Sequence, residues 1–400
     1  MVVSAAALSG CALSSHAGRA APRVLGQVDG TPLVVGKPAP DGTGQLGAVS
    51  CPSARRCWAV GVAGPDPSAA ATGAASPAVI VASADGGNTW RAEHVTGGST
   101  PQLSAVSCPT SARCMAVGSN GSSLPGGGVV VTTTDAGQTW APATAPGNVL
   151  ALVGVACQGP TACTAIVNSG TSTWSAQSTD FGLSWHQEGN LPANFQSGND
   201  LTCVPSGTCL VAGYVPTSNG HGQGAIAVST DGGRSWALAT VPPDAGVLRS
   251  AACPSTTSCL AAGSTSTTVS DVVPAKGELL RSRDGGHTWS ASARTAPVED
   301  TYGLACPSAE LCAMVGTYWV GYPAAAAGAV AQSGDGGATF RLSEAAYIPT
   351  TLAGLSCPDT TVCVAVGGRT VARITLVTPR PAPRATSTPG TESHTPSATG

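Results

Sequence analysis

The chain has 400 residues, of which 52 are glycine and 31 are proline, and only 10% are charged. This composition argues against a helix-rich fold, because glycine and proline both break helices. The formal net charge is −3 and the only lysines are Lys37 and Lys276, which argues against a basic face that binds nucleic acid. The 15 cysteines indicate an oxidising compartment rather than the reduced cytosol.

Residues 1–24 resemble an export signal followed by a short tether. Leu8-Ser9-Gly10-Cys11 is similar to the lipobox of bacterial lipoproteins, in which the cysteine thiol becomes a lipid anchor. The apolar run is short and lacks the usual basic residues before it, so plain secretion is the alternative. No stretch of 18 apolar residues occurs, which excludes a transmembrane helix in mid-chain. We therefore expect an extracytoplasmic protein, either secreted or lipid-anchored through Cys11 to the outer face of the cell membrane.

A phrase containing Cys-x5-Cys occurs seven times at intervals of 46–57 residues, as in LGAVSCPSARRCWAVG from Leu46. This period is typical of four-stranded propeller blades. A metal site would need four converging ligands and a redox motif would be Cys-x-x-Cys, so we favour a disulfide across a short hairpin in each repeat. The predicted pairs are Cys51–Cys57, Cys108–Cys114, Cys157–Cys163, Cys203–Cys209, Cys253–Cys259, Cys306–Cys312 and Cys357–Cys363.

A second phrase, Ser/Thr-x-Asp-x-Gly-x-Ser/Thr-Trp/Phe, follows each of the first six cysteine pairs, as in SADGGNTW at Ser83–Trp90. It resembles the Asp-box, or BNR, repeat of sialidase-like β-propellers. In such a turn the aspartate caps backbone N–H groups, the glycine adopts a positive φ and the aromatic ring packs between sheets. We therefore assign a structural role to Asp85, Asp135, Asp180, Asp231, Asp284 and Asp335, and to Trp90, Trp140, Trp185, Trp236, Trp289 and Phe340.

Each repeat contains four expected strands: one ends at the first cysteine, one begins at the second, one precedes the Asp box and one begins at the aromatic residue. The seventh repeat has a third strand at Arg373–Val377 but no Asp box and no fourth strand. Thr31–Lys37 (TPLVVGK) can supply that strand and close the ring. We predict an all-β, seven-bladed propeller over residues 25–378, followed by a disordered Pro/Thr/Ser-rich tail over 379–400.

The connectivity places the cysteine hairpins and the Asp boxes on one face, so the variable loops lie on the other face, where we expect binding. Aromatic side chains there can stack on sugar rings or anchor a protein, or else they extend a strand and pack between blades. Polar residues near the starts of inner strands, among them Glu299 and Asp300, can line a central pocket or be ordinary loop residues. The candidate ligand-binding residues are Tyr318, Trp319, Tyr322, Tyr302, Arg249 and Tyr214.

The resemblance includes enzymes, because sialidases of this fold use three arginines, a Tyr–Glu pair and an Arg-Ile-Pro segment. Here Arg373-Ile374 is followed by threonine in the last repeat, and Tyr302 with Glu299 gives only a partial Tyr–Glu match. The sequence therefore indicates no catalytic residues, and it leans against an enzyme.

Sortilin-type and photosystem II assembly-factor propellers, which the chain also resembles, bind peptides or proteins. We expect a non-catalytic extracytoplasmic scaffold for an envelope or extracellular protein or peptide. Carbohydrate binding is the alternative, followed by glycoside hydrolysis. No phosphate loop or ligand cluster points to a metal or another cofactor.

Overall fold

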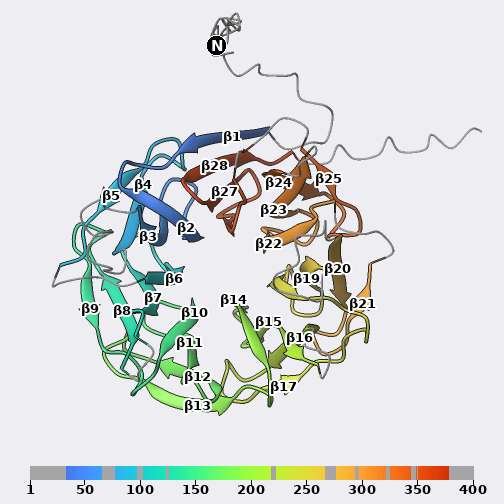
Figure 1. Cartoon of the computed structure of the whole chain (residues 1–400), viewed down its shortest axis with the longest axis horizontal. Coiled ribbons are helices and arrows are strands. Elements are labelled where there is room, and N and C mark those ends of the chain that lie inside the picture. Colours follow the sequence, from blue (N-terminus) through green and yellow to red (C-terminus); the bar gives the residue numbers. More distant parts are fainter. Residues whose placement is uncertain are drawn as a thin grey trace, which may run out of the picture.

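The computed structural model describes residues 33–64, 77–96, 102–122, 126–217, 222–265, 276–292, 297–320, 325–343, 348 and 350–377. Cys11, the segment 1–24 and the tail 379–400 lie outside these ranges. The described strands form seven four-stranded antiparallel sheets around a central axis (Figure 1). The prediction of a seven-bladed, all-β propeller is confirmed. Within these ranges, no helix is long and apolar enough to cross a membrane.

The strands of each blade follow one another from the axis outward. Blade 1 contains β2 (Thr43–Ser50), β3 (Cys57–Ala63), β4 (Ala78–Ser83) and β5 (Arg91–Glu93). Blade 2 contains β6 (Gln102–Ser107), β7 (Cys114–Ser119), β8 (Gly128–Thr133) and β9 (Ala141–Ala143). Blade 3 contains β10 (Ala151–Cys157), β11 (Cys163–Asn168), β12 (Thr173–Ser178) and β13 (His186–Asn190). Blade 4 contains β14 (Gln196–Cys203), β15 (Cys209–Pro216), β16 (Gly222–Ser229) and β17 (Ala237–Leu238).

The remaining blades have the same order. Blade 5 contains β18 (Leu248–Ala252), β19 (Cys259–Ser264), β20 (Gly277–Ser282) and β21 (Ser290–Ala291). Blade 6 contains β22 (Asp300–Ala305), β23 (Cys312–Val320), β24 (Ala325–Ser333) and β25 (Arg341–Leu342). Blade 7 contains β26 (Gly354–Ser356), β27 (Val362–Gly367), β28 (Thr370–Thr375) and β1 (Leu33–Pro38).

The ring is closed by β1, which pairs antiparallel with β28 from Leu33 opposite Thr375 to Pro38 opposite Thr370. The predicted closure by an N-terminal strand is therefore confirmed. The third strand of blade 7 begins earlier than the predicted Arg373, because Gly367 and Thr370 pair directly across a tight turn. Gly368 adopts a φ of 49° in that turn.

Disulfides join the first two strands of every blade. All seven predicted pairs form, with Cα–Cα distances of 4.0 or 4.1 Å. In blades 3 and 4 the two cysteines are direct partners in the strand register. Adjacent antiparallel strands bring Cα atoms within the range that a disulfide requires, and the bridge then fixes the hairpin. Seven such bridges are consistent with an oxidising environment.

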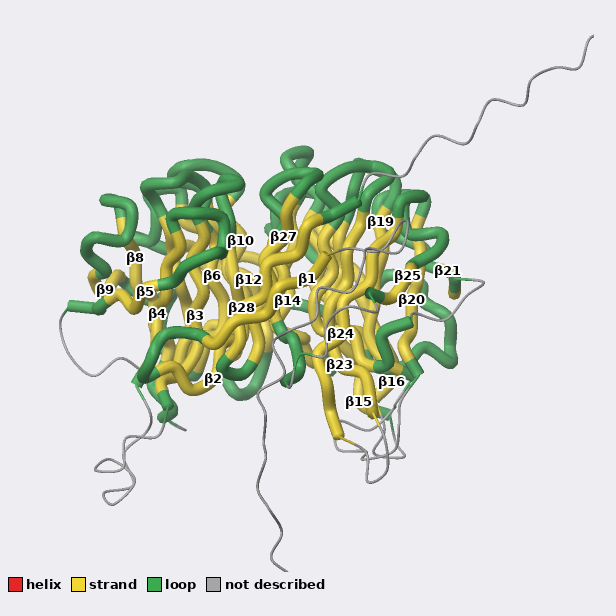
Figure 2. The backbone as a smooth tube through the Cα atoms, turned by 90° about the horizontal axis from the view of Figure 1, so that it is seen from above, coloured by secondary structure: helices red, strands yellow, loops and turns green. Residues whose placement is uncertain are grey.

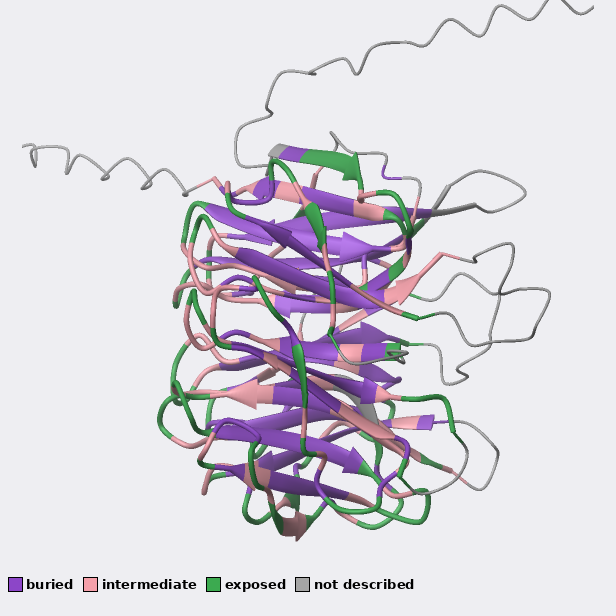
Figure 3. Ribbon diagram, turned by 90° about the vertical axis from the view of Figure 1, so that its left-hand side faces the viewer, coloured by how far each residue is buried: buried purple, intermediate pink, exposed green. Residues whose placement is uncertain are grey.

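The core lies between the blades rather than within one sheet. Successive residues of a strand point to opposite faces, so Met115 packs toward blade 3 and Ala116 toward blade 1. Both side chains are fully buried. Figure 3 shows the buried strands stacked around the ring, with most exposed residues in the connections and outer strands. Each blade is therefore stabilised by both of its neighbours.

The Asp-containing turns share one hydrogen-bond network, which blade 2 illustrates. The Thr133 hydroxyl donates to Asp135 Oδ1 (2.8 Å) and accepts from the Gly137 N–H (3.0 Å). Asp135 also accepts from the backbone N–H (3.0 Å) and hydroxyl (2.6 Å) of Thr139. The Ala136 N–H donates to the Ala112 carbonyl of the cysteine hairpin (3.0 Å). This contact puts turns and hairpins on one face, the cysteine face; the opposite face is called the loop face.

The residue after the aspartate has a positive φ in all six turns. It is glycine in four of them, but Ala136 has a φ of 63° and Phe181 a φ of 61°. The strain at Phe181 is offset by packing, since its ring is 5% exposed in the core between blades 2 and 3. The Arg113 guanidinium lies 4.9 Å from the centre of this ring.

Acid is expected to destabilise the propeller below pH 3.8, as measured by the melting temperature as a function of pH. Hydrogen bonds from the hydroxyl and N–H of Thr139 and of Ser184 lower the pKa of Asp135 and Asp180 from 3.8 to about 2. A folded pKa below the unfolded value adds stability that is complete above the unfolded value and is lost as the pH falls through the folded one. A melting temperature that stays constant from pH 4 to pH 2 would contradict this prediction.

A buried carboxylate joins blades 1 and 2. The side chain of Glu93 is 2% exposed, and its Oε2 accepts from the indole N–H groups of Trp58 (3.1 Å) and Trp140 (2.7 Å). Both indoles are fully buried, and Oε1 accepts from the more exposed Arg91 (2.9 Å). Burial raises the pKa of Glu93 above 4.5.

Six inner strands share a register irregularity of the β-bulge type, which in most of them lies near the start of the strand. In β6 it lies between Leu103 and Ala105. It brings the Gln102 carbonyl against Gly118 of β7, where a Cβ atom would overlap the carbonyl oxygen. The same backbone overlap is found at Gly61, Gly263, Gly316 and Gly367. This close approach explains the glycine that ends the second cysteine phrase in most repeats.

Candidate functional site: the central cavity

The inner strands enclose a cavity of about 880 Å3 on the axis of the ring. Its walls come from all seven inner strands or the residues beside them, together with a few residues of second strands, such as Tyr214. This volume is in the range of small-ligand pockets and also admits several side chains of a peptide.

The bulges place individual side chains in the cavity wall. Gly47, Ser104, Arg249 and Tyr302 are the extra residues of four bulges, and all four line the cavity. In β14 the irregularity extends from Ser197 to Leu201 and includes Asp200, which also lines the cavity. A bulge redirects a side chain that the regular pleat would bury between blades. The identity of the extra residue in each bulge therefore determines which side chain that blade presents to the cavity.

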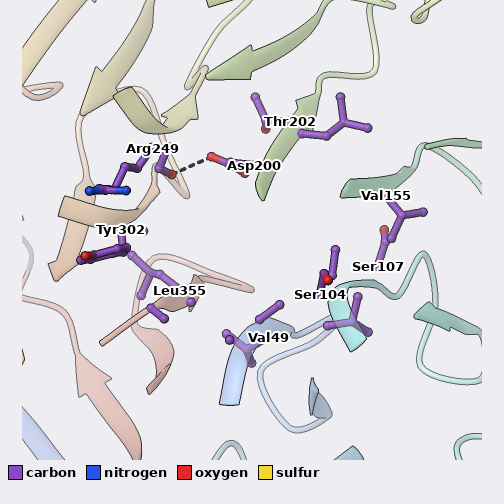
Figure 4. Close-up of a pocket in the computed structure, with 18 of the residues that line it drawn as sticks. Val49, Ser104, Ser107, Val155, Asp200, Thr202, Arg249, Tyr302 and Leu355 are labelled. Atoms are coloured by element: carbon purple, nitrogen blue, oxygen red, sulfur yellow. Dashed lines mark hydrogen bonds between the residues drawn. The ribbon is translucent and has the colours of Figure 1, made fainter. Parts of the chain in front are cut away.

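The cavity wall is chemically asymmetric, although the scaffold is a repeat. Blades 7, 1 and 2 supply only uncharged residues: the small Ala353, Gly47 and Ser104 and, among the larger ones, Gln45 and Gln102. Three contiguous blades supply the two charged side chains and a tyrosine: Asp200 from blade 4, Arg249 from blade 5 and Tyr302 from blade 6. We call these three residues the polar sector; Figure 4 shows them on one side of the cavity, opposite Ser104 and Val155.

Arg249 is held by two neighbours. Its Nε and Nη2 atoms donate to the two carboxylate oxygens of Asp300 at 2.9 and 3.3 Å. Its Cζ atom lies 4.7 Å from the centre of the Tyr302 ring, a cation–π contact. Burial raises the pKa of Tyr302, and the charge of Asp300 adds to this effect. The side chains of the ion pair are only 23% and 17% exposed, so Arg249 and Tyr302 are fixed in orientation.

Asp200 connects three blades. Its Oδ2 atom accepts from the Ser250 hydroxyl (2.7 Å) and the Ala251 N–H (2.8 Å) of blade 5. The Ser250 oxygen in turn accepts from the Leu304 N–H of blade 6 (3.0 Å). Burial raises the pKa of Asp200. Its second oxygen, Oδ1, has no hydrogen-bond partner among the residues with described positions, and Asp200 lines the cavity.

The structure brings three of the six sequence-predicted candidates to this cavity: Arg249, Tyr302 and Tyr214. The sequence predicts a loop at Tyr214, but this residue lies in strand β15 opposite Gly224. Whether these residues bind a ligand stays a prediction.

In blade 6 two of the aromatic residues extend a strand, which is one of the two alternatives predicted for them. Tyr318 and Trp319 belong to strand β23, because they pair with Ala327 and Ala326 of an extended hairpin. Tyr318 is 39% exposed and does not line the cavity. The side chain of Trp319 and all of Tyr322 lie outside the described part of the chain.

The sequence reasoning missed Asp200, although a signal was present. Three positions before the first cysteine, six repeats have alanine, glycine or serine, whereas the fourth repeat has Asp200. Among the described residues that line the cavity, Asp200 is the only carboxylic acid, whereas hydrolysis by paired carboxylates uses two. The described residues contain no group of three or more potential metal ligands.

A second cavity of about 380 Å3 lies between blades 2 and 3. Trp174 and Trp185 line it together with Asn148 and Gln187. The indole N–H of Trp185 donates to the Thr144 carbonyl of blade 2 (2.9 Å), whereas the aromatic residues of three other turns donate to their own turn. This cavity is separate from the polar sector.

Comparison with solved structures supports the architecture. The structure described as YCF48 bound to D1 peptide has a TM-score of 0.59 and 17% identity, covering 88% of this chain and 97% of that chain. YCF48 from Cyanidioschyzon merolae has a TM-score of 0.55 and 14% identity, covering 85% and 98%. The GH74 xyloglucanase from Xanthomonas campestris has a TM-score of 0.52 and 14% identity, covering 84% of this chain and 53% of the enzyme.

All three identities are 17% or lower, so these similarities concern the β-propeller fold alone. No protein-family model matches the chain, and no curated protein matches it.

Proposed function

We propose that the protein is a non-catalytic, extracytoplasmic binding scaffold that holds a peptide segment of a partner protein in the central cavity. The observation that carries this proposal is the asymmetry of the cavity wall, which is uncharged on the side of blades 7, 1 and 2 and carries the polar sector on the other side. An asymmetric wall can fix the rotation of an extended peptide about the axis of the ring, whereas a wall of seven identical blades cannot.

The polar sector is preorganised for binding. The ion pair with Asp300 and the contact with Tyr302 hold the Arg249 side chain in one orientation. A site whose side chains are already ordered loses less conformational entropy when it binds. The fold neighbour described as YCF48 bound to D1 peptide shows that a propeller of similar architecture holds a peptide.

Two long hairpins stand beside this sector on the loop face. The strands of β15–β16 and β23–β24 have 8 and 9 residues, against 6 in most other second and third strands. Figure 2 shows these hairpins extending beyond their neighbours at the loop face. They carry Tyr214 and the partly exposed Tyr318, which an approaching segment would contact first.

Selection of random linear peptides displayed on phage against the oxidised protein tests this proposal. We expect selected peptides whose affinity, measured by fluorescence anisotropy, falls about tenfold or more in Tyr302→Ala. Leu183→Ala is the matched control, because Leu183 is 75% exposed on the cysteine face. Thermal melts of each variant establish that the ring remains folded.

Peptides that bind Tyr302→Ala as tightly as the unchanged protein would contradict binding in the cavity. Failure to select peptides, together with specific signals on a glycan array, would replace the proposal by carbohydrate binding.

A further inference from the structure

The charge of the cavity restricts what it can bind. Arg249 is the only basic residue among the described residues of the wall, and both oxygens of Asp300 already accept its hydrogen bonds. An anionic group, such as the carboxylate of an acidic sugar, would have to displace Asp300 and then lie beside Asp200. Arg249 therefore serves to orient Tyr302 more than to receive an anion.

Unlike Asp300, which is paired with Arg249, Asp200 has no positively charged partner among the described residues. It interacts with a hydroxyl and a backbone N–H but with no cation among the described residues, and Oδ1 remains without a hydrogen bond. A partly buried carboxylate gains from an opposite charge, because the effective dielectric constant beside a protein wall is lower than in bulk water. Asp200 Oδ1 is therefore available to accept a hydrogen bond from a cationic group of a ligand.

The charged residues around the mouth of the cavity also favour a cationic ligand. Around the loop-face ends of blades 4–6 the described residues include five acids and two bases. The acids are Asp200, Asp244, Glu278, Glu299 and Asp300, and the bases are Arg249 and Lys276. Glu278 accepts from the Gly246 N–H (2.6 Å) and lies close enough to Asp244 for their charges to repel. This excess of negative charge attracts a basic segment toward the cavity mouth.

The aromatic residues of the wall are suited to a cationic side chain. Tyr302 and Tyr214 line the cavity from blades 6 and 4, with Asp200 on the strand next to Tyr214. An ammonium or guanidinium group gains from the face of an aromatic ring as well as from a carboxylate, and of the Tyr302 ring only the face away from Arg249 can serve in this way.

We infer that the polar sector recognises a lysine or arginine side chain of the bound peptide, with Asp200 as its charge partner. This inference rests on the proposed peptide-binding function. It makes the ligand a basic segment and excludes an acidic or purely apolar one.

Fluorescein-labelled hexapeptide pools provide the test, each with one residue fixed as lysine, arginine, norleucine, citrulline or glutamate. We expect the lysine and arginine pools to bind about tenfold more tightly than their uncharged counterparts, norleucine and citrulline, and more weakly as salt is added. This comparison uses the unchanged protein, so it does not depend on the folding of a variant.

The variant Asp200→Asn tests whether Asp200 causes the preference for basic peptides. The amide retains an oxygen that can accept from Ser250 and Ala251, so the ring should fold, but we expect the preference for basic pools to fall about tenfold. Glu310→Gln makes the same charge change in the cysteine hairpin of blade 6, on the opposite face, and is expected to have no effect.

The outcomes separate the two proposals. Preferential binding of norleucine or glutamate pools that Tyr302→Ala abolishes would overturn the cationic inference and leave peptide binding in place. A basic preference that Asp200→Asn does not change would also overturn the inference. If no pool binds and phage selection yields no peptide, the proposed function itself fails.

Discussion

Gly118→Ala is expected to lower the free energy of unfolding by about 3 kcal/mol or more, among the larger effects of a single substitution. The added Cβ would overlap the Gln102 carbonyl oxygen and lie 2.9 Å from the Leu103 Cα atom. All the contacting atoms are backbone atoms of an inner strand, so no side-chain movement relieves the overlap. The bulge of β6 would have to move, and with it the wall of the cavity.

Denaturant unfolding followed by tryptophan fluorescence measures this change. Gly159→Ala is the control, because a Cβ there would meet nothing within 4 Å and Gly159 has no positive φ. The position of Gly118 is occupied by Val167 in blade 3, whereas the other repeats have glycine there, so blade 3 shows the same position with a side chain. A Gly118→Ala protein as stable as Gly159→Ala would show that the bulge relaxes at little cost.

Glu93→Ala is expected to cost about 3–5 kcal/mol of folding free energy. It removes the shared acceptor of two buried indole N–H groups and leaves a cavity between blades 1 and 2. Glu93→Gln should cost less, because the amide keeps one oxygen that can accept from an indole. Arg91→Ala is the control: Arg91 is 62% exposed, so its loss should change stability by at most about 1 kcal/mol.

The pH dependence gives a second measurement at Glu93. Because burial raises the pKa of Glu93, the folded state holds more protons than the unfolded state between pH 4.5 and the higher pKa of the folded state. The contribution of Glu93 to stability therefore falls as the pH rises through this range, and Glu93→Gln should lack that component. Equal stability of Glu93→Ala and Arg91→Ala would contradict the shared-acceptor role.

The sequence was sufficient to predict the number of blades, the disulfides and the closing strand. Each depends on a repeated phrase whose period is independent of exact strand ends, as in Cys108–Cys114 within blade 2. The loop predicted at Tyr214 was wrong, and of the two alternatives for Tyr318 the structure shows strand extension, because hairpin length depends on the opposing strand. Small residues such as Gly224 and Ala327 allow the long hairpins to continue.

The cavity was only partly predictable, because a bulge reverses the side-chain alternation from which burial is deduced. Arg249 and Tyr302 are conspicuous as charged and aromatic residues, and the sequence was enough to identify them. Asp200 was missed because the fourth repeat departs from the common phrase just before Cys203, so that its register is not apparent.

The pairing of β1 with β28 also has a consequence for biogenesis. Leu33 is synthesised before blades 1–6, but its partner Thr375 follows only after them. Contacts between residues so far apart in sequence form slowly, because a very long loop must be closed. Strand β1 therefore has to wait for its partner β28 during synthesis. The ring is completed in a late step that depends on an intact blade 7.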